Sequence, residues 1–222
     1  MSTVMAETIP ASLAGKRIAI TGSTGFVGTA LVERLVRSVP ECELVLLVRD
    51  GRRTPAARRT QREILKNDAF DRLRDTHGDN FDAAVASRIQ TVAGDVTRDG
   101  LGLNDADRAL WGTADIIIHS AAAVSFDSPM DSAVEINLLG PTRIANLANE
   151  MGVTPHLVAV STCYVAGNRR GNAPEILVSE GPFDVGIDWR SEVAATRRLR
   201  SDTDAASRTP EQLKTFRKQA RA

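Results

Sequence analysis

The residues best suited to chemistry in this chain are Gly22, Gly25 and Gly28, spaced three residues apart directly after a short apolar run. Glycines at such a spacing, between a strand and a helix, are typical of turns that hold a pyrophosphate. The first permits a tight turn, the second lets backbone approach the phosphates, and the third lets the helix pack on the strand. The start of that helix adds unpaired N–H groups that attract anions. The sequence therefore predicts a dinucleotide site made by Thr21, Gly22, Ser23, Thr24, Gly25, Phe26, Val27 and Gly28, with a turn that binds nothing as the alternative.

The end of the second apolar run bears on which dinucleotide is bound. An acidic residue at this position accepts hydrogen bonds from a free ribose 2′-hydroxyl and repels a 2′-phosphate. The run ends instead in Arg49, whose guanidinium can bind phosphate through two parallel hydrogen bonds. We therefore expect NADP(H) rather than NAD(H). Asp50, one position later, favours the opposite choice, and a solvated basic loop is a further alternative because six arginines lie between positions 49 and 62.

A proline marks a third place with chemical potential. Pro141 follows Asn137 by four residues in a stretch of helical character. Proline has no N–H, so the Asn137 carbonyl cannot receive its usual helical hydrogen bond. The freed carbonyl can hold a water molecule for proton transfer. A simple helix kink with an idle asparagine is the alternative.

Short runs rich in Val, Ile and Leu alternate with helical stretches, which predicts a parallel sheet covered on both faces. We expect strands at residues 17–21, 43–48, 88–93, 115–119 and 156–161, and helices at 27–37, 59–74, 104–111 and 131–150. This order is typical of an α/β fold with a doubly wound parallel (Rossmann) sheet and its ligand at the carboxyl ends of the strands. The predicted domains are a flexible leader (1–14), the Rossmann domain (15–170) and an irregular, helical, charged extension (171–222). Within the extension, Thr209-Pro210-Glu211-Gln212 predicts a helix start with a capping box.

Bulk composition excludes several classes of function. The 28 basic and 28 acidic residues cancel, so no global charge favours nucleic acid or an anionic membrane. Two cysteines, Cys42 and Cys163, are too few for a disulfide scaffold and suit a reducing compartment. The three histidines are scattered, and no metal site is expected. Apolar runs fall well short of the ~20 residues that span a bilayer, and the first 14 residues lack a signal-peptide pattern. We therefore expect a cytoplasmic protein, for which peripheral membrane contact stays open.

Several stretches together resemble the fatty acyl-CoA reductase (thioester reductase) branch of the extended short-chain dehydrogenases/reductases. The thioester-reductase domain of carboxylic acid reductases is similar too. The resemblance implies an NADP-dependent oxidoreductase of lipid metabolism that reduces an acyl thioester, on CoA or a carrier protein, to an aldehyde or alcohol. The similar stretches lie in about residues 16–170 and read Thr-Gly-Ser-Thr-Gly-Phe-Val-Gly, Leu-Leu-Val-Arg, Gly-Asp-Val followed by Leu-Gly-Leu, Ala-Ala-Ala-Val-Ser-Phe, Glu-Ile-Asn-Leu-Leu-Gly and Ser-Thr-Cys-Tyr-Val-Ala-Gly.

The resemblance also assigns roles to single residues. It implies that Asp95, followed by Val96, lies against the adenine amino group, and that a run of alanines lies beside the cofactor. Asn137 matches the asparagine of the family's proton relay, and Thr162 matches the hydroxyl that binds the substrate oxygen. The residues assigned to the cofactor in this way are Asp95, Val96, Ala121, Ala122 and Ala123.

The catalytic Tyr-x-x-x-Lys pair of this superfamily is absent from the 222 residues. Tyr164 is the only tyrosine, and residue 168 is Asn rather than Lys, so we expect Tyr164 to pack or line a pocket. Residues 189–222 look like the helical insertion that precedes the catalytic helix in such enzymes. The chain is therefore expected to be the cofactor-binding portion of a longer reductase, binding cofactor without turnover.

Two other functions stay open. A sugar-nucleotide epimerase or dehydratase shares the extended architecture, although Arg49 and the long polar segment 51–86 count against it. A non-catalytic module that binds or senses NADP is the third reading. The missing Tyr-x-x-x-Lys pair favours that module if the chain is complete.

Overall fold

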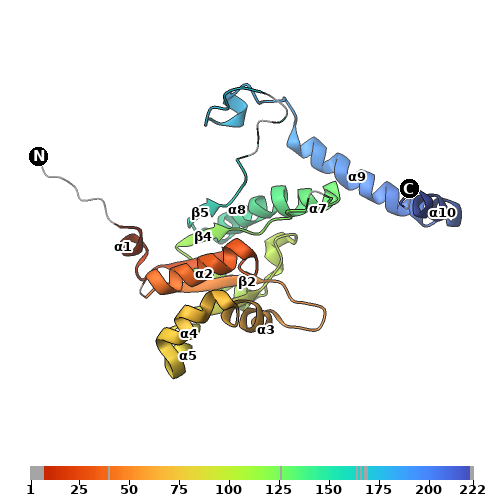
Figure 1. Cartoon of the computed structure of the whole chain (residues 1–222). Coiled ribbons are helices and arrows are strands. Elements are labelled where there is room, and N and C mark those ends of the chain that lie inside the picture. The colour runs from red at the N-terminus through yellow and green to blue at the C-terminus, as the bar shows by residue number, and fades with distance from the viewer. Residues whose placement is uncertain are drawn as a thin grey trace, which may run out of the picture. The chain divides into compact units, whose positions relative to one another are not determined.

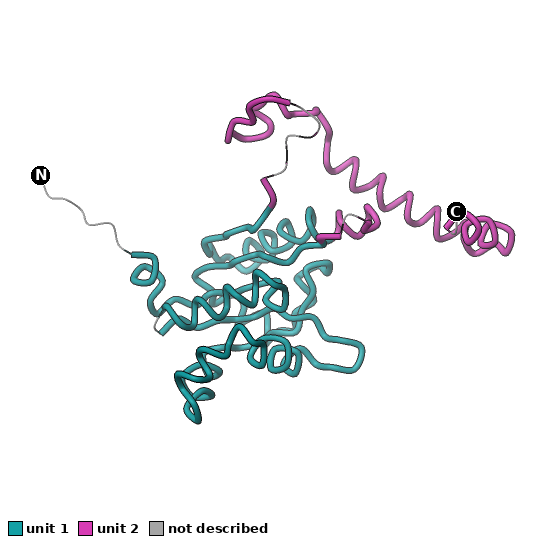
Figure 2. The backbone as a smooth tube through the Cα atoms, in the orientation of Figure 1, with its two compact units in different colours: residues 1–123, 136–161 teal, residues 124–135, 162–222 magenta. Residues whose placement is uncertain are grey.

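The computed structural model describes residues 8–39, 41–125, 127–163, 165, 167 and 170–220. The chain divides into two compact units, shown in Figure 2. Unit 1 comprises residues 1–123 and 136–161, and unit 2 comprises residues 124–135 and 162–222. All five strands that the structure describes belong to unit 1.

Unit 1 is built on a parallel sheet with the strand order β3-β2-β1-β4-β5, of which Figure 1 labels β2, β4 and β5. The order reverses between β1 and β4, so the carboxyl ends of these neighbouring strands flank the place where ligands bind in such sheets. At that edge Thr21 of β1 is in register with Leu47 of β2 and with His119 of β4. The predicted doubly wound α/β fold is confirmed. The strands are β1 (Arg17–Thr21), β2 (Glu43–Val48), β3 (Ile89–Ala93), β4 (Ile116–His119) and β5 (His156–Ala159).

Successive residues of the central strands enter two separate cores, because side chains alternate between the faces of a sheet. On one face Ile18 and Ile20 pack with α2 (Phe26–Ser38). On the other face Ala19 packs with α6 (Asp105–Trp111) and α8 (Leu139–Met151). Burial on both faces explains why β1 and β2 are almost continuous apolar runs.

The predicted long helix at 59–74 is wrong, because the segment folds as several short helical pieces. The break lies at Asn67, whose side chain accepts a hydrogen bond of 3.0 Å from the Ala69 N–H and so competes with the helical backbone. This turn allows Phe70 to be fully buried. The pieces are α3 (Ala56–Arg59), the π-helical η1 (Thr60–Leu65), η2 (Asp68–Phe70), α4 (Asp71–His77), η3 (Gly78–Asn80), α5 (Phe81–Ala84) and η4 (Ala86–Arg88).

The helix predicted at 131–150 is present but irregular. It consists of α7 (Met130–Ala133), the π-helical η6 (Val134–Leu138) and α8. Pro141 can donate no N–H to the Asn137 carbonyl, and the proline ring clashes with that carbonyl in a regular α-helix. The wider π turn lies where this conflict arises, and such turns are frequent at functional sites. Gly152 ends α8 in the left-handed conformation, with φ of 67°.

The remaining elements are short, except for two helices of unit 2. Thr209 is the N-cap of α10 and Pro210 its first residue, as predicted. The capping box is wrong, because the Thr209 hydroxyl donates to the Ala206 carbonyl at the end of α9 instead. A helix within the predicted leader places Leu13 against the core, while the domain limits stay predictions. These elements are α1 (Ile9–Leu13), η5 (Asp99–Gly102), η7 (Val178–Glu180), α9 (Trp189–Ser207) and α10 (Pro210–Gln219).

The Arg88 side chain forms hydrogen bonds to the end of α2 and to the segment that joins α2 to β2. Its guanidinium donates to the carbonyls of Val36 (3.0 Å), Val39 (2.6 Å) and Cys42 (3.0 Å). The last carbonyls of a helix have no partner within the helix itself. A single side chain, 46 to 52 residues away in sequence, therefore satisfies three carbonyls at the point where α2 leads into β2.

We predict that Arg88→Met lowers the free energy of unfolding by about 2–4 kcal/mol, because it leaves partly buried carbonyls without donors. Urea unfolding followed by circular dichroism measures the change. Arg72→Met is the control. Arg72 is exposed on α4, and its replacement is expected to cost less than about 0.5 kcal/mol. Equal stability of the two variants would contradict the role of Arg88.

Candidate functional site

The turn between β1 and α2 has a shape that requires glycine at two positions. Gly22 has φ of +75°, and a Cβ atom there would lie 2.5 Å from the Ala121 nitrogen. A Cβ atom on Gly28 would overlap the carbonyl oxygen of Gly22. The turn, the start of α2 and the loop after β4 therefore meet backbone against backbone, which no side chain at these positions permits.

The first turn of α2 keeps backbone donors available for a ligand. Its N-cap is Gly25, which offers no capping side chain, and Thr29 donates the first hydrogen bond, 2.9 Å to the Gly25 carbonyl. The Ser23 hydroxyl is buried and has no hydrogen-bond partner among the described residues. An uncapped helix end, a cradle that a Cβ would fill and an orphaned hydroxyl all fit a pyrophosphate. Thr24 is half-buried in the same turn.

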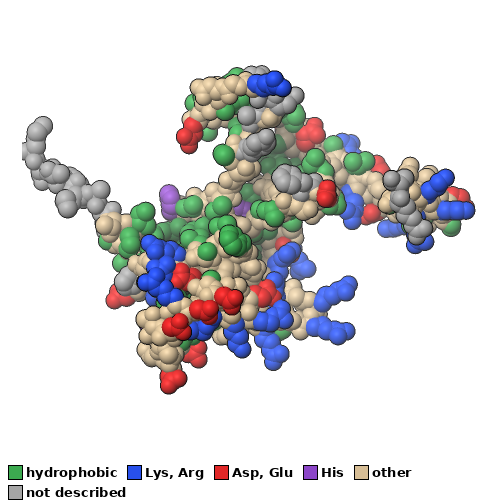
Figure 3. Space-filling view, viewed as in Figure 1, with side chains coloured by type: hydrophobic (Ala, Val, Ile, Leu, Met, Phe, Trp, Pro, Cys, Tyr) green, Lys and Arg blue, Asp and Glu red, His purple; other side chains and the backbone are tan. Residues whose placement is uncertain are grey.

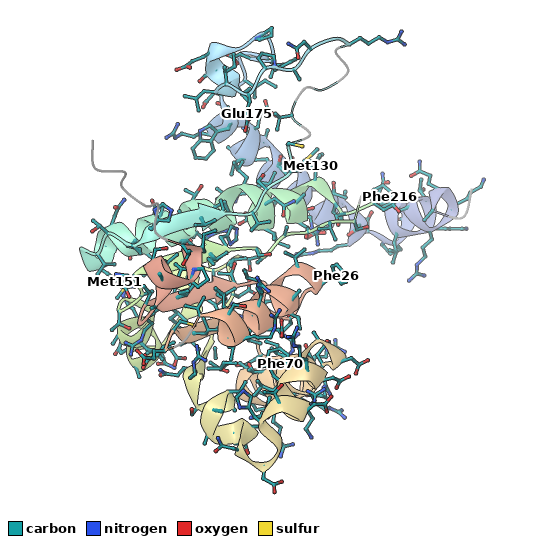
Figure 4. The ribbon with its side chains drawn as sticks, turned by 60° about the vertical axis from the view of Figure 1, so that its left-hand side comes forward. Phe26, Phe70, Met130, Met151, Glu175 and Phe216 are labelled. Atoms are coloured by element: carbon teal, nitrogen blue, oxygen red, sulfur yellow. The ribbon has the colours of Figure 1, made fainter. Side chains whose placement is uncertain are left out.

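Phe26 and Val27 begin α2 with apolar side chains that the fold leaves uncovered. Phe26 is 94% exposed and Val27 is 54% exposed. Figure 4 shows Phe26 at the end of the α2 ribbon. Their predicted contacts with the cofactor stay predictions.

The end of β2 separates the roles of its two charged residues. The Asp50 carboxylate accepts a hydrogen bond of 2.8 Å from the Ala56 N–H at the start of α3, so it is engaged within its own loop. The Arg49 carbonyl accepts from Arg59 at 2.7 Å. The Arg49 side chain is exposed and makes no hydrogen bond or ion pair with the described residues. Figure 3 shows Lys and Arg side chains gathered on the side of the molecule where Figure 1 labels α3.

Asp95 and Val96, the next two predicted cofactor residues, follow the end of β3, and Val96 lies near the start of α8. Asp95 is half-buried, and its Oδ1 accepts hydrogen bonds from the Thr97 N–H (2.9 Å) and hydroxyl (2.8 Å). Its Oδ2 meets no donor among the described residues, which leaves it available for the predicted adenine contact. Val96 is buried in the core, where a Cβ on Gly140 of α8 would lie 3.6 Å from its side chain.

The loop after β4 is held from two sides. The Ala121 N–H donates to the Thr21 hydroxyl oxygen at 3.2 Å. Further along, the Asn137 side chain pairs with the Ala123 backbone: Oδ1 accepts from the Ala123 N–H (2.8 Å) and Nδ2 donates to the Ala123 carbonyl (3.0 Å). Ala122 between them is exposed. The structure thus brings Thr21, the alanine loop and Asn137 together, while the role of the Asn137 carbonyl stays a prediction.

Sequence reasoning missed His119. It lies at the end of β4, is 4% exposed, and its Nδ1 is 2.7 Å from the Thr21 hydroxyl oxygen. Burial lowers the pKa of His119. The only signal in the sequence was its position at the end of a predicted strand, directly before Ser120 and the alanines.

Thr162 lies in unit 2 and is exposed, and its role in binding the substrate oxygen stays a prediction. Tyr164 lies outside the described residues. Within the described ranges, no His, Cys, Asp and Glu side chains form a group of three suited to a metal ion. The helices in the same ranges lack the combination of length and apolar character that crossing a membrane requires.

A doubly wound parallel sheet with this glycine turn defines a dinucleotide-binding domain of the short-chain dehydrogenase/reductase kind. The sequence profile of the NAD-binding family described as "Male sterility protein" matches residues 20–219. The chain belongs to this family, in the fatty acyl-CoA reductase branch of the extended short-chain dehydrogenases/reductases. This membership supports a nicotinamide cofactor, and its contact with the glycine turn stays a prediction.

Known proteins support this assignment. The chain is 36% identical to fatty acyl-CoA reductase 1 of Arabidopsis thaliana, over 78% of this chain and 35% of that protein. It is 29% identical to the alcohol-forming fatty acyl-CoA reductase of Simmondsia chinensis, over 93% of this chain and 43% of that protein. The terminal R domain of the myxalamid PKS-NRPS pathway is similar in structure, with a TM-score of 0.53 and 30% identity over 72% of this chain and 38% of that one. The chain thus spans between about a third and a half of these relatives.

We predict that Gly28→Ala weakens cofactor binding at least ~tenfold, because the new methyl group pushes the turn away from the start of α2. Calorimetric titration with NADPH measures affinity, and urea unfolding shows whether the fold survives. Gly181→Ala is the control, because its φ of −109° suits alanine and its nearest neighbour is the flexible end of Ile176 at 3.3 Å. Unchanged NADPH affinity in Gly28→Ala would contradict the assigned turn.

Proposed function

We propose that this chain is the NADP(H)-binding portion of an oxidoreductase that reduces a fatty acyl thioester, carried on CoA or a carrier protein, to an aldehyde or alcohol. The glycine turn carries the cofactor part of this proposal. The names of the relatives, which are fatty acyl-CoA reductases, support the substrate class. Arg49 and the long polar segment 51–86 count against the sugar-nucleotide alternative.

Arg49 supports NADP(H) over NAD(H). Its side chain extends from the carboxyl end of β2, exposed and without a partner among the described residues. The competing acid, Asp50, accepts a hydrogen bond from the Ala56 N–H through Oδ1. A free guanidinium at this position favours a 2′-phosphate over a bare 2′-hydroxyl, because it can bind phosphate through two parallel hydrogen bonds.

In this proposal the chain's own residues bind and orient. The cofactor, when bound, supplies the hydride. The backbone N–H groups at the start of α2 bind the pyrophosphate, and the alanine loop forms a wall beside the nicotinamide end. Asn137 keeps that wall in place through its two bonds to Ala123. Thr162 is proposed to hold the substrate oxygen.

Turnover needs a proton donor, whereas cofactor binding does not. Reducing a carbonyl develops negative charge on its oxygen, which needs a positioned acid. A tyrosine has an unperturbed pKa near ~10 and needs a nearby cation to act around neutral pH. Tyr164 has no lysine four residues later, and a threonine hydroxyl is a poor acid. We therefore propose that the 222 residues bind NADP(H) without catalysing reduction. We further propose a cytoplasmic location, since Cys42 and Cys163 are both free thiols.

We predict that the chain binds NADPH at least ~tenfold more tightly than NADH, about 1.4 kcal/mol, and that Arg49→Ala removes this preference. Fluorescence titration with both cofactors measures it. Arg58→Ala is the matched control, since Arg58 is exposed in the same basic segment but lies on α3. If both variants lose the same modest affinity, the segment acts only as a solvated basic loop.

We also predict no oxidation of NADPH by these 222 residues in the presence of a long-chain acyl-CoA, although NADPH binds. The measurement is absorbance of NADPH under conditions where titration shows the site to be filled. Steady turnover that disappears in Tyr164→Phe would mean that Tyr164 is the acid and that this part of the proposal is wrong. Absence of NADPH binding would instead contradict the cofactor proposal.

A further inference from the structure

Two polar side chains beside the cofactor turn are almost completely shielded from solvent. Thr21 is 0% exposed and His119 is 4% exposed. They are register partners at the carboxyl ends of β1 and β4, with Thr21 Oγ1 and His119 Nδ1 2.7 Å apart. A buried hydrogen bond of this kind is costly to break, because each group would be left without a partner in a low-dielectric interior.

The surrounding donors assign the protons of this pair. The Ala121 N–H donates to Thr21 Oγ1, so the hydroxyl proton is the one that points to His119. His119 Nδ1 is then an acceptor, and the neutral ring carries its proton on Nε2. The reverse arrangement would leave the hydroxyl proton without an acceptor among the described residues. Burial lowers the pKa of the His119 ring, which keeps it neutral around pH ~7.

Among the described residues, no charged side chain contributes to the lowered pKa of His119. β1 presents the Thr21 hydroxyl, and β5 contributes the backbone, with the Val160 N–H donating to the His119 carbonyl at 2.8 Å. From α8, a Cβ on Gly140 would lie 3.7 Å from His119 Cε1. Burial is the one cause of the lowered pKa, so proton uptake by the ring has no nearby carboxylate to offset it.

The pair also lies at the centre of the backbone contacts that form the site. On one side it holds Ala121, whose nitrogen leaves no room for a side chain on Gly22. On the other side the ring packs beside α8, which follows Asn137, the residue bonded to Ala123. The pair therefore borders elements that contact both ends of the alanine loop.

We infer that Thr21 and neutral His119 form a positioning pair that sets the loop of residues 120–123 against the cofactor turn, and that protonation of His119 weakens cofactor binding. The inference rests on the assignment of the glycine turn to a nicotinamide cofactor. A protonated Nδ1 donates to Thr21 Oγ1 instead of accepting from it, so the buried hydroxyl proton loses its acceptor and Oγ1 is shared between Nδ1 and the Ala121 N–H, which weakens the bond that positions Ala121. The loop of residues 120–123 then no longer holds its position against the glycine turn.

Cofactor affinity as a function of pH tests the inference. NADP⁺ affinity is measured by calorimetry between about pH 5 and pH 8. In the wild type the dissociation constant should rise at least ~fivefold as pH falls, following uptake of one proton by the protein. His119→Asn places an amide oxygen where Nδ1 accepts, and its profile should keep only the titration of the ligand's own phosphate. His156→Asn, an exposed histidine on β5, should keep the wild-type profile. Identical profiles for wild type and His119→Asn would overturn the inference.

A second measurement needs no cofactor. Nitrogen-15 NMR of the free protein should show His119 protonated on Nε2 and titrating below the unperturbed value of ~6.5. The amide resonances of Ala121 and Ala123 should move with the same midpoint. If these amides stay still while His119 titrates, the coupling is absent and the inference is wrong. Failure to bind any nicotinamide cofactor would contradict the cofactor assignment, while this measurement would still decide the coupling.

A loss of cofactor affinity at low pH must be distinguished from unfolding of the protein. The pKa of folded His119 lies below that of the unfolded chain, so between the two values the unfolded state binds more protons. Stability therefore falls as pH decreases through that window. Circular dichroism at each pH restricts the affinity comparison to conditions where both proteins are folded.

Discussion

The site depends on one steric constraint, which is the contact of three backbone segments with no side chain between them. The end of β1, the start of α2 and the loop after β4 meet at Gly22 and Gly28. A close approach of this kind brings backbone N–H groups to one place, and it also lets the Thr21 hydroxyl reach both Ala121 and His119. The polar network is therefore a consequence of the glycines, since any Cβ at these positions would separate the segments that the hydrogen bonds connect.

A second regularity concerns the polar side chains around this contact. Asp50 is bonded to the start of α3, Asp95 to Thr97, and Asn137 to Ala123. One side-chain oxygen of each residue accepts a hydrogen bond from a backbone N–H, and these bonds hold the loops at the carboxyl edge of the sheet. Several donors at this edge have no partner among the described residues, namely the first N–H groups of α2, the Ser23 hydroxyl and the Arg49 guanidinium. An anionic ligand suits such an edge.

The same residues show what sequence reasoning can and cannot predict. β1, β2 and α2 were predictable because burial on both faces of a parallel sheet leaves continuous apolar runs, and glycine spacing is a local signal. The helix at 59–74 was not, because the bond from Asn67 to Ala69 and the burial of Phe70 decide the break. The Thr209 capping box failed for a related reason, as α9 ends close enough to take the hydroxyl. His119 and Thr21 are 98 residues apart, so their bond exists only once β1 and β4 are neighbours.

The strands do not contribute equally to this arrangement. β1 and β2 are almost wholly buried, β4 lies between β1 and β5, and every residue of β5 is exposed. The cofactor residues extend from the ends of β1 to β4, so their positions are set by the most densely packed part of unit 1. Thr162 follows β5, at the edge of the sheet, and belongs to unit 2. Packing therefore preorganises the cofactor side of the proposed site, because Thr21 is fully buried at the end of β1, whereas Val193 is the only buried residue among the described residues that follow β5.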